Sequence, residues 1–293
     1  FAAGWQAVEQ SGGEEAQQIN FGYLLYESTL EKQDSLLREY ALKWLEKYPD
    51  NQVAQHMGNA VLNRAVRPQG IPMWIRHVLV PGITDNDEYL KNIFDIFAPD
   101  FEQVLTGLDY RAPELIRCLL EEIYGSKKSP RLRILDAGCG TGFCGGFLKK
   151  YSSFRGLYGV DISEKMLEQA QAKKVYSHLL QSELEQYFSQ AKTKFDLIVS
   201  ADVFTYFGSL EKLLSGMAGS LSAGGRVIFT VSENNLNDDD YFLHSSGRYL
   251  HHQNYVGKVL EKVGFEVEKL ERAKLRNEGE NIVYGYVVSA LKK

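Results

Sequence analysis

The chain has 293 residues, and its 44% hydrophobic and 24% charged residues exclude a fibrous or a disordered protein. The net charge of −5 argues against nucleic acid as a partner, because phosphate binding needs clustered Lys and Arg. No apolar run approaches the about 18 residues that a membrane helix needs, so we expect no membrane partner. Three cysteines (Cys118, Cys139 and Cys144) cannot form a disulfide framework, which predicts a cytoplasmic protein.

Residues 1–66 are predicted to form an N-terminal helical arm. Apolar side chains recur there at helical spacing, at Tyr40, Ala41, Trp44, Leu45 and Tyr48. The stretch 41–51 resembles the end of a tetratricopeptide repeat, and the alternative is a plain helical hairpin. If the resemblance holds, the arm is a candidate docking site for a protein partner.

Residues 67–88 are predicted to be a linker or an insertion, because Pro and Gly punctuate them. The stretch 70–90 resembles part of the radical-SAM enzymes that activate glycyl-radical enzymes. Those enzymes hold an iron–sulfur cluster with a CxxxCxxC triad, which this chain lacks. We therefore carry over no chemistry from this stretch. Two helices are expected to follow, at 89–98 and 113–124.

Residues 89–293 are predicted to form the main domain, because strand and helix patterns alternate from residue 131 onward. The expected strands are 132–136, 157–161, 176–180, 195–201, 226–231, 265–270 and 282–291. The expected helices are 142–151, 163–173, 184–190, 210–219 and 253–263. This alternation predicts a doubly wound, mostly parallel α/β sheet of seven strands. No helix separates the last two strands, so they must pair antiparallel.

A glycine-rich turn at residues 136–142 is the most informative motif. The predicted first strand ends at Asp136, and Gly138, Gly140 and Gly142 follow before a helix begins. Such glycines let the backbone turn sharply and let a ligand approach, while the helix start offers free N–H groups. Asp161 ends the second strand, where a carboxylate can accept both hydroxyls of an adenosine ribose.

Two adenosine cofactors compete for this motif. The run 140–145 satisfies the GxGxxG pattern of a dinucleotide site. Counted from Gly138, however, the third glycine position falls on Phe143, which would block a pyrophosphate. Asp136 before the glycines suits a cationic ligand group, such as the α-ammonium of S-adenosylmethionine (SAM). The residues therefore favour SAM over NAD.

The motifs LDAGCGTG and GVDIS resemble the first two motifs of the class I SAM-dependent methyltransferases, which have a Rossmann-like fold. Residues 195–202 (FDLIVSAD) and 221–229 (LSAGGRVIF) resemble the motifs of that family's fourth and fifth strands. With its N-terminal arm, the chain is most similar to bacterial methyltransferases that carry tetratricopeptide-like repeats. The resemblance implies a transferase that uses SAM.

The resemblance also implies which residues hold the cofactor. Asp136, Gly138 and Gly140, with Ala137 and Cys139 between them, match the residues around the methionine part. Asp161 matches the ribose ligand and Ile162 the cover of the adenine. Glu183 is the candidate for the adenine amine, and Met166 and Leu184 complete that side. Ala201 and Asp202 match the strand end whose carbonyls meet the ammonium, and Tyr110 with Arg111 is a candidate for the SAM carboxylate.

The acceptor side is predicted from the long connection 232–254. It carries Arg248, Tyr249 and His251, which we expect to face the acceptor as catalytic residues, with His251 as the candidate base. The alternative is a surface loop in which Tyr249 packs against the sheet. No residues have the spacing of a metal site.

The sequence therefore predicts a SAM-dependent methyltransferase acting by in-line displacement on a small molecule, a peptide or a protein. A non-catalytic SAM-binding module that docks a partner through its helical arm is the alternative, and an NAD-dependent oxidoreductase ranks third.

Overall fold

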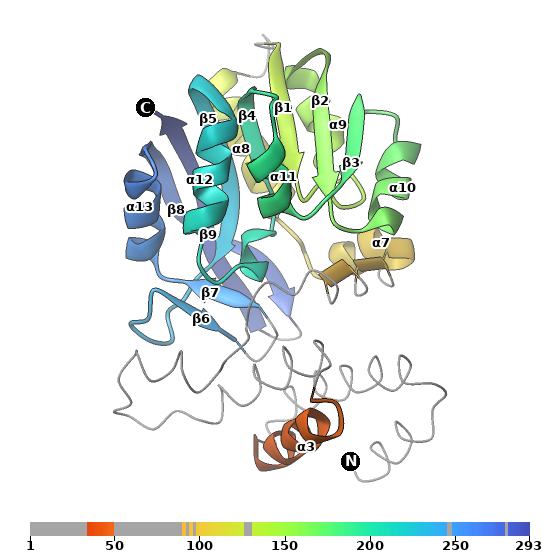
Figure 1. Ribbon diagram of the computed structural model, residues 1–293, viewed down its shortest axis with the longest axis vertical. Coiled ribbons are helices and arrows are strands. Elements are labelled where there is room, and N and C mark those ends of the chain that lie inside the picture. The colour runs from red at the N-terminus through yellow and green to blue at the C-terminus, as the bar shows by residue number, and fades with distance from the viewer. Residues whose placement is uncertain are drawn as a thin grey trace. The chain divides into compact units, whose positions relative to one another are not determined.

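The computed structural model describes residues 34–49, 90–91, 94–95, 98–125, 131–244, 248–278 and 281–293 (Figure 1). The chain forms two compact units, residues 1–89 with 243–248 and residues 90–242 with 249–293. In the first unit, helix α3 (Asp34–Lys47) buries Ala41 and Trp44, which lie three residues apart on one helix face. The rest of the predicted arm and the whole predicted linker 67–88 lie outside the described residues.

A seven-stranded sheet forms the centre of the second unit. Its strands are β1 (Leu132–Ala137), β2 (Ser152–Asp161), β3 (His178–Gln181), β4 (Phe195–Ser200), β5 (Leu221–Ser232), β8 (Phe265–Glu278) and β9 (Asn281–Lys292). Their order is β3-β2-β1-β4-β5-β9-β8. The first five strands are parallel, whereas β9 pairs antiparallel with both β5 and β8. The predicted doubly wound, mostly parallel sheet is confirmed.

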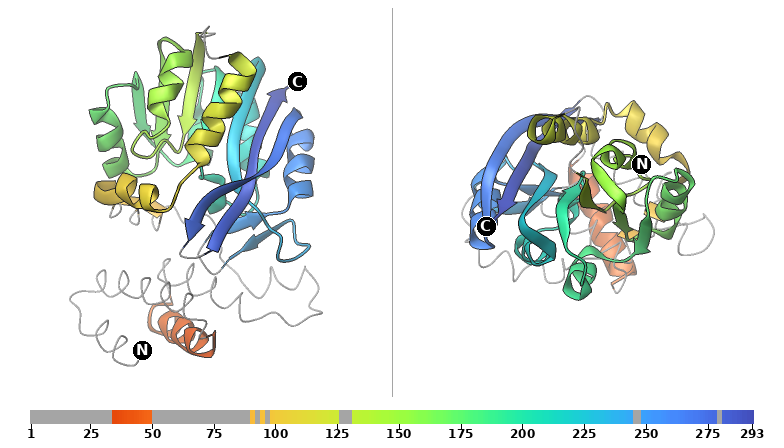
Figure 2. Two further views of the ribbon diagram at one scale, coloured as in Figure 1. Left: turned by 180° about the vertical axis from the view of Figure 1, so that it is seen from behind. Right: turned by 90° about the horizontal axis from the view of Figure 1, so that it is seen from above.

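Helices cover both faces of this sheet, as the opposite views of Figures 1 and 2 show. They are α8 (Ala112–Tyr124), α9 (Gly145–Tyr151), α10 (Glu164–Ala172), α11 (Leu184–Gln190), α12 (Glu211–Ser220) and α13 (Gln253–Lys262). Neighbouring strand residues point to opposite faces, so Leu135 and Ile198 join the core under α11, α12 and α13, while Ile134 and Leu197 join the core under α8 and α9.

The strand order reverses between β1 and β4, because β2 lies on one side of β1 and β4 on the other. In a doubly wound sheet, ligands bind at the carboxyl ends of the strands beside such a reversal. The glycine turn after β1 and the ends of β2 and β4 lie at this place. None of the helices in the described ranges has the length and apolar character needed to cross a membrane.

Several connections differ from the sequence-based expectations. The segment 232–254 is no plain loop, since β6 (Tyr241–Leu243) and β7 (Tyr249–His251) pair within it. Before β1, the short helices η1 (Ala98–Asp100) and α7 (Phe101–Gly107) were not predicted, nor was η2 (Phe204–Tyr206) after β4. Strand β8 continues to Glu278, eight residues beyond its predicted end at 270.

Candidate functional site

The turn after β1 has a backbone that favours glycine. Gly138, Gly140 and Gly142 have φ angles of 74°, 52° and 82°, in the left-handed region. A Cβ atom on Gly138 would lie 2.3 Å from Cγ2 of Val203, so the turn also needs a bare backbone there for packing. The N–H groups of Gly138 and Cys139 both donate to the carbonyl oxygen of Val160, at 2.8 and 3.0 Å. These bonds fix the turn against the end of β2.

Asp161 ends β2 and organises the same turn. Its Oδ2 accepts the N–H of Gly140 at 2.7 Å, and its Oδ1 accepts the N–H of Ser163 at 3.0 Å. Burial raises the pKa of Asp161 to about 6, although the backbone bonds oppose that shift. Each carboxylate oxygen can accept a second hydrogen bond, which leaves capacity for a ribose hydroxyl.

Asp136 lies at the end of β1 and is almost fully buried. Burial raises the pKa of Asp136 to about 7, against the lowering effect of a 2.6 Å hydrogen bond from the hydroxyl of Tyr176. Tyr176 precedes β3 and fills the space that Gly142 and Gly145 leave, since Cβ atoms there would lie 2.9 and 2.8 Å from its ring. No sequence motif marks Tyr176, because only the fold brings it to the glycine turn.

The uncharged predicted cofactor residues lie at strand ends, as Ala137 does, or in the turns and helices that follow them, as Met166 in α10 and Leu184 in α11 do. Ala137, Cys139, Met166 and Leu184 are buried, and Ile162 is half-buried. Burial raises the pKa of the Cys139 thiol, with nearby Asp161 adding to the shift, so this side chain stays neutral. These residues supply apolar surface rather than charge.

Glu183 is an N-cap rather than an exposed acid. Its carboxylate oxygens accept the N–H groups of Glu185 and Gln186, at 2.6 and 2.5 Å, at the start of α11. Such a cap satisfies two of the free N–H groups of the helix. The carboxylate thus has a structural task at the start of α11, and its expected bond to an adenine amine stays a prediction.

Arg111 forms a local ion pair. Its guanidinium pairs with Glu114, three residues further along the chain, at 2.9 Å, and both side chains are more than 40% exposed. Its expected role toward the SAM carboxylate stays a prediction. The ring of the adjacent Tyr110 packs edge-on against Phe143, and burial together with nearby Asp202 raises the pKa of its phenol.

The end of β4 carries an ion cluster that no sequence motif indicates. Beyond Ala201, which is half-buried, both carboxylate oxygens of Asp202 accept bonds from Nη1 of Arg276 at 2.9 Å. The Arg276 side chain is 2% exposed and also donates to Glu278 at 2.9 Å. Arg276 fell outside the strand predicted at 265–270, so nothing in the local pattern placed it at the site.

The predicted acceptor residues lie elsewhere than expected. His251 is fully buried, and its Nε2 lies 3.0 Å from the carbonyl oxygen of Gly208. Burial lowers the pKa of His251 to about 4, so the ring is neutral at pH 7. We expected His251 to face an acceptor as a base. Instead it is enclosed by the protein and contacts the backbone at Gly208, in the connection after β4.

Tyr249 packs rather than facing an open site. It is buried and makes an edge contact with the ring of Tyr241, and both rings crowd the space beside Gly208. The packing alternative from the sequence therefore describes Tyr249 better than the catalytic one. Arg248 belongs to the other unit, where its carbonyl oxygen accepts the N–H of His244 at 2.9 Å, and its catalytic role stays a prediction.

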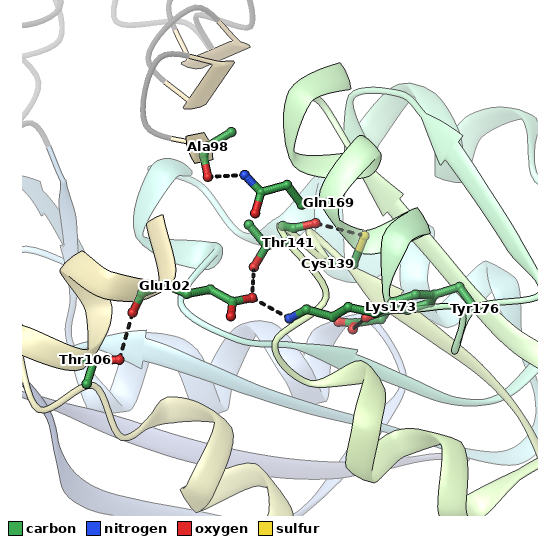
Figure 3. Close-up of polar contacts among 10 residues, drawn as sticks. Ala98, Glu102, Thr106, Cys139, Thr141, Gln169, Lys173 and Tyr176 are labelled. Carbon is green, nitrogen blue, oxygen red and sulfur yellow. Dashed lines mark hydrogen bonds and ion pairs between the residues drawn. The ribbon is translucent and has the colours of Figure 1, made fainter. Parts of the chain in front are cut away.

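A segment before β1 contacts the glycine turn through polar side chains (Figure 3). Oε1 of Glu102, on α7, accepts the hydroxyl of Thr141 at 2.7 Å and also pairs with Lys173, just after α10. Gln169, on α10, donates to the carbonyl oxygen of Ala98. These contacts join the segment to both the glycine turn and the helix that follows β2.

The site as a whole fits the chemistry of SAM. Two buried carboxylates, Asp136 and Asp161, flank a turn whose glycines leave bare Cα surface, while their N–H groups hold the turn in place. A carboxylate buried without a countercharge is costly, which a ligand ammonium would relieve. No Lys or Arg among the described residues 136–145 would attract a pyrophosphate, which disfavours a dinucleotide.

Comparisons with known proteins agree with this geometry. The family model for a methyltransferase domain matches residues 135–229. Human methyltransferase-like protein 27 is 42% identical over 99 residues, which are 33% of this chain and 39% of the relative. The malonyl-[acyl-carrier protein] O-methyltransferase of Priestia megaterium is 26% identical over 151 residues, which are 51% of this chain and 53% of that protein. The chain thus spans about half or less of the length of these relatives.

A solved structure shares the fold over a longer stretch. The magnesium protoporphyrin IX methyltransferase of Synechocystis PCC 6803, with bound SAH, superimposes with a TM-score of 0.57 at 18% identity. The alignment covers 71% of this chain and 100% of that chain. Residues 135–229 therefore match a methyltransferase domain, and the unit that contains them shares its fold with that methyltransferase.

Proposed function

We propose that this chain binds SAM at the carboxyl ends of β1, β2 and β4 and transfers its methyl group to an acceptor. The observation that carries the proposal is the pair of buried carboxylates, Asp136 and Asp161, on either side of a left-handed glycine turn within a methyltransferase domain. An NAD-dependent reaction lacks such support, because Phe143 occupies the position of the third glycine.

The residues divide the binding task among themselves. Asp161 offers its remaining lone pairs to the ribose hydroxyls while it holds Gly140 in place. Asp136 offers a carboxylate to the α-ammonium, and the Tyr176 hydroxyl orients that carboxylate. Tyr110 lies beside the end of β4, within the electrostatic reach of Asp202. Ile162 and Met166 supply apolar surface beside the ribose site.

When bound, SAM supplies a sulfonium methyl that an acceptor atom can displace in line. Because the leaving group is neutral and stable, the chain's main task is to hold the two reactants at reacting distance. A strong base is needed only for an acceptor that must lose a proton early. The neutral, buried His251 is consistent with a reaction that does not depend on that residue as a base.

The acceptor is a small molecule, a peptide or a protein. The printed names of similar proteins point to different acceptors, a malonyl thioester of a carrier protein and a magnesium porphyrin. Those names therefore do not choose among the classes for this chain. The alternative function, a SAM-binding module that docks a partner without catalysis, shares the same cofactor site.

The first test measures SAM binding by isothermal titration calorimetry on the full chain, together with NAD as a competitor. We expect saturable SAM binding that NAD does not displace and that Asp161→Asn weakens. Asp196→Asn is the matched control, since Asp196 also accepts a backbone N–H, from Arg133 at 2.8 Å, but near the start of its strand. NAD binding in place of SAM would refute the proposal.

The second test separates catalysis from binding alone. Incubation of the chain with methyl-labelled SAM and a cell extract should label an acceptor, and fractionation by size then assigns the acceptor class. Asp161→Asn should reduce the labelling, whereas Asp196→Asn should not. Tight SAM binding without any label transfer, across extracts prepared under several growth conditions, would favour the non-catalytic module.

A further inference from the structure

The charged side chain of Arg276 is the largest buried charge in the described residues that the cofactor motifs do not explain. Only 2% of it is exposed, and its partners are the carboxylates of Asp202 and Glu278. Burying a guanidinium between two acids does not by itself stabilise a fold, because the desolvation cost rivals the attraction. Its position therefore calls for a reason other than stability.

The fold brings Arg276 to the end of β4 through an extended hairpin. Strand β5 pairs with β9 only between Ser232 and Arg226, so β8 and β9 continue beyond it. Figure 2 shows both strands running along the edge of the sheet. The segment between α7 and α8 holds this extension in place through two backbone hydrogen bonds. The N–H of Asn277 donates to the carbonyl oxygen of Leu108 at 2.7 Å, and the N–H of Arg111 donates to the carbonyl oxygen of Leu275 at 2.8 Å.

Asp202, the partner of Arg276, has an unusual backbone. Its φ is 57°, in the left-handed region that residues other than glycine seldom adopt. Its N–H donates to the hydroxyl of Thr230 at 2.9 Å. Just before it, the hydroxyl of Ser200 donates to the carbonyl oxygen of Ala137, so this strand end is tied to the glycine turn. The direction of the last carbonyl groups of β4 depends on this turn.

We propose that Arg276, steadied by Glu278, is a positioning residue for the cofactor site. Its two bonds to the Asp202 carboxylate hold that residue in the left-handed conformation, which directs the carbonyl groups at the end of β4 toward the ammonium of SAM. The cluster of one guanidinium and two carboxylates carries a net negative charge, which also suits a cationic neighbour. This inference rests on the proposed function, because it assigns a role toward SAM.

The first experiment compares SAM affinities by calorimetry. Arg276→Gln should bind SAM at least tenfold more weakly, and Arg276→Lys, which keeps the charge, should fall between it and the unchanged chain. Arg226→Gln is the matched control. Arg226 forms a two-bond pair with Glu268 at 2.6 Å, opposite the start of β4. This control should bind SAM within twofold of the unchanged chain.

A second-site rescue distinguishes positioning of the backbone from general stability. In a chain that carries Arg276→Gln, the added change Asp202→Gly should recover SAM affinity at least threefold, because glycine adopts a positive φ without a partner. The added change Asp202→Ala removes the same unpaired carboxylate but keeps the backbone penalty, so it should not. If Arg276→Gln does not fold, the same pair of changes is compared in Arg276→Lys.

Different results of these experiments would overturn the proposed function and the role of Arg276. An unchanged chain that binds no SAM overturns the proposed function, and the inference with it. Normal SAM binding by a folded Arg276→Gln chain overturns the inference alone. Equal rescue by glycine and alanine also overturns it, because the lost contact would then act through charge or stability and not through the backbone of Asp202.

Discussion

The buried carboxyl of Asp136 should make the stability of the folded chain depend on pH. In the ligand-free fold the pKa of Asp136 is about 7, against an ordinary value of 3.8, chiefly because the carboxyl is buried. Between these values the folded chain holds a proton that the unfolded chain has lost. Asp136 therefore favours the folded state at low pH, and this contribution is lost as the pH rises toward 7. From pH 5 to pH 8 the loss is about 3 kcal/mol, at about 1.4 kcal/mol for each pH unit below 7.

The change Asp136→Asn removes this titration while keeping the shape and an oxygen for the Tyr176 hydroxyl. The free energy of unfolding should therefore rise in the variant, relative to the unchanged chain, by about 3 kcal/mol between pH 5 and pH 8. Urea unfolding at both pH values measures this difference. Comparing the two chains at each pH cancels the contribution of His251 to the unfolding free energy. Its pKa, lowered to about 4, gives that contribution the opposite pH dependence.

Binding supplies an independent check on the same group. An ammonium beside Asp136 should favour its charged form, so SAM affinity should increase from pH 5 to pH 8 in the unchanged chain. In Asp136→Asn that increase should become smaller. A stability difference between the two chains that does not vary with pH would refute the assigned burial effect. SAM affinity with the same pH dependence in both chains would remove Asp136 from the ammonium site.

Three further predictions concern single residues. Asp161→Ala should weaken SAM binding by about 1.5–3 kcal/mol in calorimetry, the scale for hydrogen bonds to a charged group, and unchanged affinity would remove Asp161 from the ribose role. Gly140→Ala should lower the free energy of unfolding in urea by about 1–2 kcal/mol, because the φ of Gly140 is 52°. Gly146→Ala in helix α9 is the control: its new Cβ would meet no neighbouring atom within 4 Å, so it should not destabilise the chain. His251→Ala should lower the unfolding free energy by at least about 2 kcal/mol, because it empties a buried site and unpairs the Gly208 carbonyl, and a loss of activity without a loss of stability would restore the catalytic role.

Local patterns in the sequence were sufficient to predict the sheet and the glycine turn. All seven strands of the main sheet were expected, because alternating apolar runs and short polar breaks record strand and helix periods directly. Asp136 and Asp161 were found for the same reason, since each follows its own strand and needs no distant partner to be recognised. The antiparallel pair β8–β9 followed from the absence of a helix between them.

The predictions that depended on the exposure of a side chain were the ones that the tertiary structure changed. His251 and Tyr249 looked like acceptor residues because they lie in a long connection, yet pairing of β6 with β7 places both among aromatic rings. Arg111 and Glu183 each have a partner within three residues, which the strand and helix patterns did not indicate. Sequence patterns report which residues are polar, whereas the direction of a side chain depends on what surrounds it.

The contacts that shape the site join residues far apart in the chain. Tyr176 reaches Asp136 across 40 positions, and Arg276 reaches Asp202 across 74. Neither pair leaves a periodic signal, because each arises where strands from different parts of the chain end at one edge of the sheet. The sequence by itself determined the strands, the turn and the two strand-end acids. Only the tertiary structure decided which side chains hold those acids, because strand order and hairpin length bring them together.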